Sequence, residues 1–138
     1  MDEKKSLTTE ETFALAVQNH RKNNLKVAGN LYNEILKTNP NHVDARNNLG
    51  TILLKLGKLQ IAKSCFEKAI EINPNYIGAH NNLGVVFNEL GEYKKAINSY
   101  QKELRLKPNS INAQANISSI YISQLDDLKK AIRASYKA

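Results

Sequence analysis

Asn47-Asn48-Leu49-Gly50 recurs as Asn81-Asn82-Leu83-Gly84, 34 residues further along the chain. The prolines follow the same spacing, since Pro40, Pro74 and Pro108 lie 34 residues apart and an asparagine follows each of them. A fixed period of this length indicates stacked supersecondary units that share a continuous core. After a polar lead over residues 1–8, one domain over 9–138 is predicted, with units at 9–42, 43–76, 77–110 and a partial 111–138.

Each unit has the pattern of two helices joined by a short turn. Thr8 and Glu11 are spaced as a capping box ahead of an apolar series, which predicts a first helix that runs to about Lys22. Asn23-Asn24 interrupts the pattern. Apolar residues at three- and four-residue steps from Leu25 onwards then predict a second helix.

The second and third units repeat this plan. Helices are expected over about 43–56 and 59–72, with a turn at Gly57-Lys58 between them. The third unit places its turn at Gly91-Glu92, and a tight turn between helices needs a residue that tolerates positive φ. Both glycines therefore predict helical hairpins.

The fourth unit departs from the pattern. Asp126-Asp127-Leu128 aligns with Gly91-Glu92-Tyr93 only if one extra residue is allowed. We therefore expect a turn at Asp126-Asp127 and a second helix that stops at Ala138 before it reaches full length. A repeat stack normally ends in a polar closing helix. Its absence favours either a piece of a longer protein or self-association through this end.

Composition narrows the classes of partner. The net charge is +7, but no unit carries more than +2, and the lysines and arginines alternate with glutamates. This distribution favours a solvated surface over a nucleic-acid interface, which would need a basic stripe along the phosphates. No apolar run is long enough for a membrane span or a signal peptide. The lone Cys65 fits a reducing compartment, so a soluble, cytoplasmic protein is predicted.

These residues at fixed offsets resemble the tetratricopeptide repeat family, over about residues 9–138. The second unit supplies Leu49, Gly50, Leu53, Ala62, Phe66 and Pro74, and the third supplies Leu83, Gly84, Phe87, Ala96, Tyr100 and Pro108. The resemblance implies an all-α, right-handed superhelical solenoid of antiparallel helix pairs. Arg46, His80 and Glu103 depart from the pattern, because other units or the family place apolar residues there.

The repeated asparagines are the candidate binding residues. In this family the first helices line a concave groove, so the resemblance implies a row of Asn48, Asn82 and Asn116 and a partial row of Asn47 and Asn81. A carboxamide can both donate to and accept from an extended peptide backbone, and Asn is otherwise unfavourable inside helices. The resemblance extends to members with a concave asparagine ladder that holds a peptide main chain. Alternatively, the asparagines bond to local backbone or are inherited by repeat duplication.

The same register gives three more groove candidates, namely Thr51, Lys55 and Asn88. Other members of the family bind the C-terminal tail of chaperones through Lys, Asn and Arg side chains from three units. The same register shows which residues of this sequence stand at those positions. The corresponding places hold Phe13, Val17, Asn48, Gly78 and Asn82, or one unit later Asn47, Thr51, Asn82, Asn112 and Asn116. Only the middle asparagine matches, so binding of a chaperone tail is not expected.

No residue pattern indicates catalysis, a metal or a cofactor. His20, His42 and His80 lack the neighbouring ligands that a metal needs, and no glycine-rich phosphate loop occurs. The sequence therefore predicts a non-catalytic scaffold that binds a peptide or protein. The alternative is the N-terminal substrate-recruiting domain of a longer transferase-type enzyme.

Overall fold

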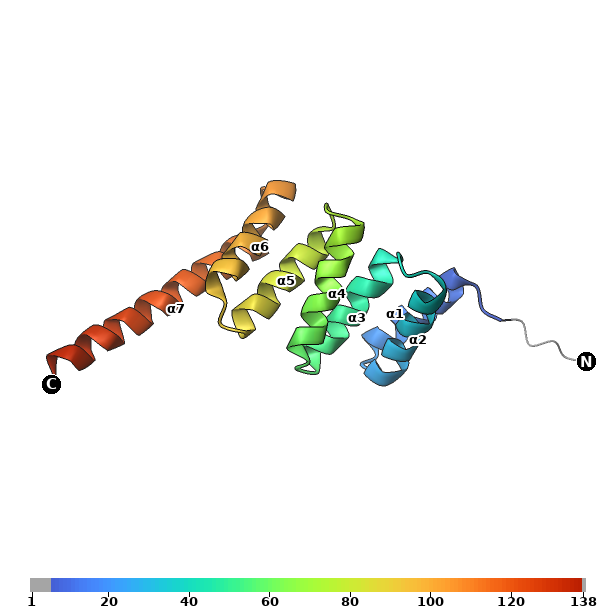
Figure 1. The fold of residues 1–138 in the computed structure, drawn as a ribbon, viewed down its shortest axis with the longest axis horizontal. Coiled ribbons are helices and arrows are strands. Elements are labelled where there is room, and N and C mark those ends of the chain that lie inside the picture. The colour runs from blue at the N-terminus through green and yellow to red at the C-terminus, as the bar shows by residue number, and fades with distance from the viewer. Residues whose placement is uncertain (1–5, 138) are drawn as a thin grey trace, which may run out of the picture. The chain divides into compact units, whose positions relative to one another are not determined.

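The computed structural model describes residues 6–137, which form seven α-helices and no strand (Figure 1). The helices are α1 (Thr9–Arg21), α2 (Leu25–Thr38), α3 (Val43–Lys55), α4 (Leu59–Ile72), α5 (Ile77–Glu89), α6 (Tyr93–Leu106) and α7 (Ile111–Tyr136). The predicted all-α helical-repeat fold is confirmed. Residues 1–5 of the predicted polar lead lie outside the described part of the chain.

The chain divides within α5 into two compact units, the first ending at Ala79 and the second beginning at His80. In the first unit α1 pairs with α2 and α3 with α4, and α2 also packs against α3 (Figure 1). Tyr32, Ile35, Ile52 and Phe66 are large buried side chains of this unit, and buried alanines accompany them. In the second unit α6 packs against α7, around Tyr100 and Ile120.

Glycine lets the two helices of a hairpin approach closely. A Cβ on Gly50 would lie 2.6 Å from a ring carbon of Phe66, and one on Gly84 would lie 2.5 Å from the ring of Tyr100. Both aromatic side chains are buried. The repeated Leu-Gly pair therefore marks the place on α3 and α5 where the ring from the following helix packs.

The residues before four of the helices also follow the 34-residue period. Thr8, His42, Tyr76 and Ser110 precede α1, α3, α5 and α7. Thr8 forms the predicted capping box with Glu11, and the side chains of His42 and Ser110 accept from backbone N–H groups three residues on. Capping satisfies donors that the first turn of a helix leaves unpaired. Tyr76 instead donates its hydroxyl hydrogen to Asp44.

The turns inside the hairpins share one backbone feature. Asn23, Gly57 and Gly91 stand at equivalent positions, and their φ angles are +64°, +77° and +76°. Asparagine and glycine adopt this left-handed conformation more readily than other residues. Its recurrence explains why three hairpins reverse at the same point of the repeat.

The fourth hairpin is absent, so the predicted turn at Asp126-Asp127 is wrong. Helix α7 runs without interruption for 26 residues, from Ile111 to Tyr136. Counted by the strict 34-residue period, without the extra residue, Leu125 stands in the place of Gly91, and a left-handed conformation is strained for a γ-branched residue. The helix therefore continues where the other units turn.

Candidate functional site

Three helices of the first unit contribute to one hydrogen-bonded chain of side chains. Asn48 on α3 donates from Nδ2 to the hydroxyl oxygen of Tyr32 on α2, over 3.3 Å. That hydroxyl lies 3.3 Å from Nδ1 of His20 on α1. Because the phenol oxygen accepts from Asn48, its own hydrogen is available to donate to Nδ1 of His20. The chain thus fixes the orientation of the Asn48 carboxamide.

The protonation states of these groups agree with this direction of donation. Burial lowers the pKa of His20, and the nearby ammonium of Lys55 lowers it further. A neutral imidazole with its proton on Nε2 leaves Nδ1 free to accept. Burial raises the pKa of Tyr32, which keeps its hydroxyl protonated. His20 and Tyr32 therefore form a neutral anchor for Asn48.

Asn48 retains capacity for a ligand. Its side chain is half-buried, and Oδ1 accepts no hydrogen bond from any residue that the structure describes. An amide oxygen has two lone pairs, and Nδ2 has a second hydrogen besides the one directed at Tyr32. The carboxamide can therefore accept from a peptide N–H and donate to a peptide C=O.

Thr51 and Lys55, the other predicted groove residues on α3, make local bonds. The hydroxyl of Thr51 donates to the main-chain oxygen of Asn48 over 2.7 Å. The ammonium of Lys55, which is exposed, donates to Oδ1 of Asn23 over 2.7 Å. Lys55 thereby joins the turn between α1 and α2 to the end of α3.

Asn47 and Asn81 differ from Asn48 in their surroundings. Asn47 is 7% exposed, and Gly78 lies close to its amide nitrogen. In the second unit Asn81 on α5 donates to Oε2 of Glu103 on α6 over 2.8 Å, and the hydroxyl of Ser110 donates to Oε1 of the same carboxylate over 2.8 Å. Asn47 is therefore buried, and the half-buried Asn81 is held by a bond between the helices of its hairpin.

Glu103 explains one departure from the repeat pattern. Its carboxylate is only 5% exposed, where the preceding unit has Ala69. A buried carboxylate is tolerated when its oxygens accept hydrogen bonds, and here Asn81 and Ser110 supply them. Burial raises the pKa of Tyr100 to about 12, and the carboxylates of Glu103 and Glu89 add to that increase.

The remaining predicted residues belong to the second unit. Asn82 on α5 and Asn116 on α7 are half-buried, and Asn88 near the end of α5 is exposed. Asn82 makes an interaction within the chain. All three have part of their surface open to solvent.

Sequence reasoning missed the partners that orient Asn48. Tyr32 occupies the position of Phe66 in the next unit and of Tyr100 in the third, so the repeat pattern identified it only as a core aromatic residue. The hydroxyl was the available signal, because a buried Tyr hydroxyl needs a polar partner. The sequence indicated of His20 only that it lacks neighbouring metal ligands, whereas in the structure it bonds to Tyr32.

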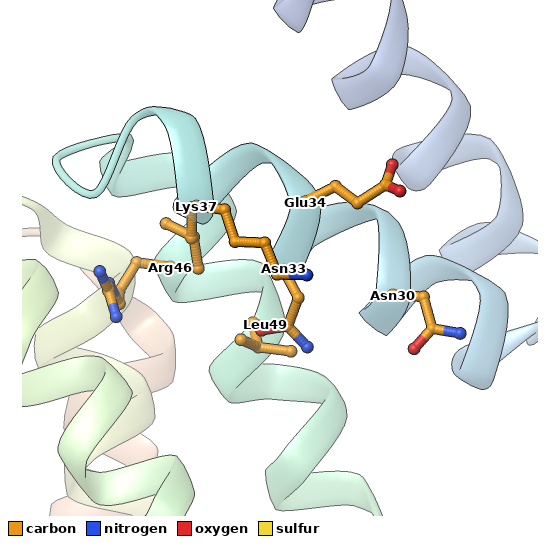
Figure 2. A pocket seen from close by; sticks show the side chains of 7 residues that line it. Asn30, Asn33, Glu34, Lys37, Arg46 and Leu49 are labelled. Carbon is orange, nitrogen blue, oxygen red and sulfur yellow. The ribbon is translucent and has the colours of Figure 1, made fainter.

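A hollow of about 650 Å³ lies on the first unit, and His20, Tyr32 and Asn48 are not among the residues that line it. Residues of α2 and α3 line it, and Figure 2 shows Arg46 and Glu34 directed toward opposite ends. Arg46 donates from Nη2 to the carbonyl of Pro40 over 2.8 Å, while its buried Nε has no partner among the described residues. Asn30 and Asn33 are exposed on the α2 side of the hollow. Because the charges of Arg46 and Glu34 point apart, they do not form a binding site for a single charged group of a ligand.

Residues 6–137 offer neither a metal site nor a helix able to cross a membrane. No three His, Cys, Asp or Glu side chains in this range are grouped so that they could hold a metal ion. None of the helices in the same range combines the length and apolar character that crossing a membrane requires. The lone Cys65 is buried, and burial raises the pKa of its thiol.

Comparisons with known proteins agree with this arrangement of helices. Two family models described as tetratricopeptide repeat match residues 43–76 and 65–98. A search of curated protein sequences finds no significant match.

Several solved structures share the fold. One is the first TPR domain of Spaghetti (RPAP3) bound to the HSP90 peptide SRMEEVD, which is 19% identical with a TM-score of 0.81, over 85% of this chain and 93% of that chain. MamA is 24% identical with a TM-score of 0.80, over 94% of this chain and 80% of its own. The TPR domain of Arabidopsis OM64 is 23% identical with a TM-score of 0.78, over 81% and 93%.

Proposed function

Since this chain is a tetratricopeptide repeat protein, we propose that it is a non-catalytic scaffold that holds an extended peptide through asparagine side chains. The observation that carries the proposal is the state of Asn48. Its carboxamide is oriented by Tyr32 and retains an acceptor and a donor for a ligand. Two hydrogen bonds to one peptide unit fix the register of a main chain without selecting its side chains.

Asn82 and Asn116 occupy the same repeat position as Asn48, so each would contact a further stretch of the peptide. Thr51, Lys55 and Asn88 would border the ligand. We assign a supporting part to Asn47 and Asn81, because Asn47 is buried and Asn81 bonds to Glu103. Lys55 and Glu89 carry opposite charges in the same register, which favours a peptide of low net charge.

The test is the double substitution Asn48→Ala with Asn82→Ala. A fluorescein-labelled peptide, selected from a peptide array by its binding to the purified chain, serves as the probe. Each lost bidentate contact should weaken binding by about 1–3 kcal/mol, or roughly 5- to 150-fold, when fluorescence anisotropy is measured. The melting temperature should stay within a few degrees of the wild-type value.

Asn30→Ala with Asn33→Ala is the matched control, because both residues are exposed asparagines on α2. This control should bind the probe as the wild type does. Leu49→Ala should instead destabilise the fold, because the half-buried Leu49 packs against the core of the first unit; the loss should lie toward the lower end of the about 2–5 kcal/mol typical of a buried leucine. Unchanged affinity of the Asn48 and Asn82 double variant would assign these asparagines a structural part only.

The alternative function is recruitment of substrates for a longer transferase-type enzyme, of which this chain would be the N-terminal domain. The same asparagine face would then hold the substrate protein. The full-length reading frame tests this alternative. A stop codon soon after Ala138 would exclude it.

We further propose that the protein is cytoplasmic and that its C-terminal part can self-associate. Cell fractionation tests the location. The apolar side chains exposed on α7 support self-association.

A further inference from the structure

The second half of α7 presents an uncovered apolar face. Six large apolar side chains between residues 121 and 136 are 47–85% exposed, namely Tyr121, Ile122, Leu125, Leu128, Ile132 and Tyr136. Steps of four, three and four residues separate Tyr121, Leu125, Leu128 and Ile132, so these four form one stripe along the helix. Figure 1 shows this half of α7 continuing beyond α6. Soluble proteins rarely leave so long an apolar stripe in water.

Helix α7 also carries the repeat positions that form the two facing surfaces of a helical hairpin in the other units. In the third unit Gly84 on the first helix receives the ring of Tyr100 from the second. Ser118, the small residue equivalent to Gly84, is exposed on α7. Residues 128–132, Leu-Lys-Lys-Ala-Ile, repeat the pattern of residues 93–97, Tyr-Lys-Lys-Ala-Ile. Ala96 is fully buried in its hairpin, whereas the matching Ala131 is exposed.

A single chain cannot bring these two surfaces together while α7 is intact. Its 26 residues form a continuous rod of about 39 Å, at about 1.5 Å per residue. The surface around Ser118 corresponds to the first helix of a hairpin, and the surface around Ala131 corresponds to the second. In α7 both lie on one straight helix, at different positions along its axis, so they cannot pack against each other. A second rod in the opposite direction would place each surface against its complement.

We propose that two copies of this chain pair through antiparallel α7 helices, with residues 126–136 of each copy covering residues 114–125 of the other. Each copy covers the same surface of the other, so the two copies form a closed two-fold dimer. Neither copy then has this surface free to bind a third chain. The six apolar side chains expose on the order of 600 Å² per copy, close to the roughly 800 Å² per partner of a standard interface. Helical spacing turns Lys130 and Arg133 away from the stripe, so these charges stay in water.

This dimer gives a specific form to the self-association proposed above and does not depend on peptide binding. Sedimentation equilibrium of the purified chain at tens of micromolar should give twice the monomer mass. Leu128→Glu with Ile132→Glu should give the monomer mass with unchanged far-ultraviolet circular dichroism. The matched control, Lys130→Glu with Arg133→Glu, changes charge on the same helix away from the stripe and should remain a dimer.

Disulfide trapping tests the direction and register of pairing. Chains with Ser118→Cys are mixed with chains with Ser135→Cys, because these positions correspond to Gly84 and Tyr100 of the hairpin. Oxidation should join the two different variants. The native Cys65 should not interfere, since it is buried and its raised pKa keeps it protonated.

A monomer at these concentrations would overturn the proposal, as would disulfides that join only Ser118→Cys chains to each other, because the pairing would then be parallel. Asn48→Ala with Asn82→Ala should leave the dimer intact. Loss of peptide binding and loss of dimerisation are therefore measured independently.

Discussion

At the scale of single residues, the position of an asparagine in the repeat does not determine which side chains surround it. Asn47 and Asn48 are neighbours in sequence, yet Asn47 is buried, whereas Oδ1 of the half-buried Asn48 accepts no hydrogen bond from residues 6–137. The 34-residue period predicted which residues are equivalent, because equivalence depends on spacing alone. It could not predict the bond from Asn48 to Tyr32, because that bond depends on a hydroxyl from a different hairpin which Phe66 lacks in the next unit.

The His20 environment predicts how stability depends on pH. Its pKa in the folded protein is lower than the usual 6.5, so the unfolded chain takes up a proton at a higher pH than the folded one. The stabilisation is therefore complete above about pH 6.5 and decreases as pH falls from there toward the folded-state pKa. Urea unfolding at pH 7.5 and pH 5.5 should show a larger loss of stability for the wild type than for His20→Gln. Equal losses would mean that His20 does not carry the effect.

Asn81 and Asn82 should respond differently to the same substitution. Asn81→Ala removes a donor to the buried carboxylate of Glu103 and leaves one oxygen without that partner. Such a loss typically costs about 1–3 kcal/mol, and more where the group is charged. Asn82→Ala should lower the unfolding free energy less when both are measured in urea. Restoration of stability in Asn81→Ala with Glu103→Ala, which returns position 103 to the alanine of the second unit, would attribute the loss to this pair.

At the scale of elements, the sequence predicted the helices that end in recognisable signals. The capping box at Thr8 and the turns at Gly57 and Gly91 are all present. The prediction failed at Asp126-Asp127, where alignment of the following Lys-Lys-Ala-Ile pattern suggested a turn. A turn needs a residue that accepts positive φ, and the strict 34-residue period places Leu125 at that point, where the helical conformation costs less. The backbone requirement of the turn therefore outweighed the side-chain pattern of the helix after it.

Two helix glycines should give opposite results when replaced by alanine. Gly29 lies inside α2, and a Cβ there would have its nearest neighbour, a methyl carbon of Leu49, at 3.9 Å. Gly29→Ala should stabilise the protein by about 0.5–1 kcal/mol, because alanine loses less backbone freedom in a helix. Gly50→Ala should destabilise it, since its Cβ would come within 2.6 Å of Phe66. Chemical denaturation of both variants checks the sign of each change.

At the scale of the whole molecule, charge is distributed rather than concentrated. The net charge of +7 is spread over all four units. The described lysine–glutamate ion pairs, such as Lys68 with Glu71, lie on exposed helix surfaces. Surface pairs of this kind contribute little stability, so the charge acts mainly on solubility and on encounters with partners. Under the proposed function, selectivity for a peptide would then come from hydrogen bonding and shape rather than from net charge.

The peptide SRMEEVD, seen with the RPAP3 domain, provides a test of that selectivity. The places that would hold its terminal carboxylate contain Phe13, Val17 and Gly78 in one register, and no lysine or arginine in the next. We expect no saturable binding to this chain at up to about 100 μM by isothermal titration calorimetry, because an unpaired carboxylate loses hydration without compensation. A dissociation constant of about 10 μM or lower would show that other cations take their place.

The continuous α7 also determines where amide hydrogens exchange fastest. From Tyr121 onward every described residue of this helix is exposed, and an isolated helical segment of this length is only marginally stable in water. Deuterium should therefore enter residues 121–137 by local fraying, well before it enters α1 to α4. If a second copy covers this segment, its exchange slows as protein concentration rises, while exchange in the first unit does not change. The region without a hairpin partner would then be the one whose dynamics report assembly.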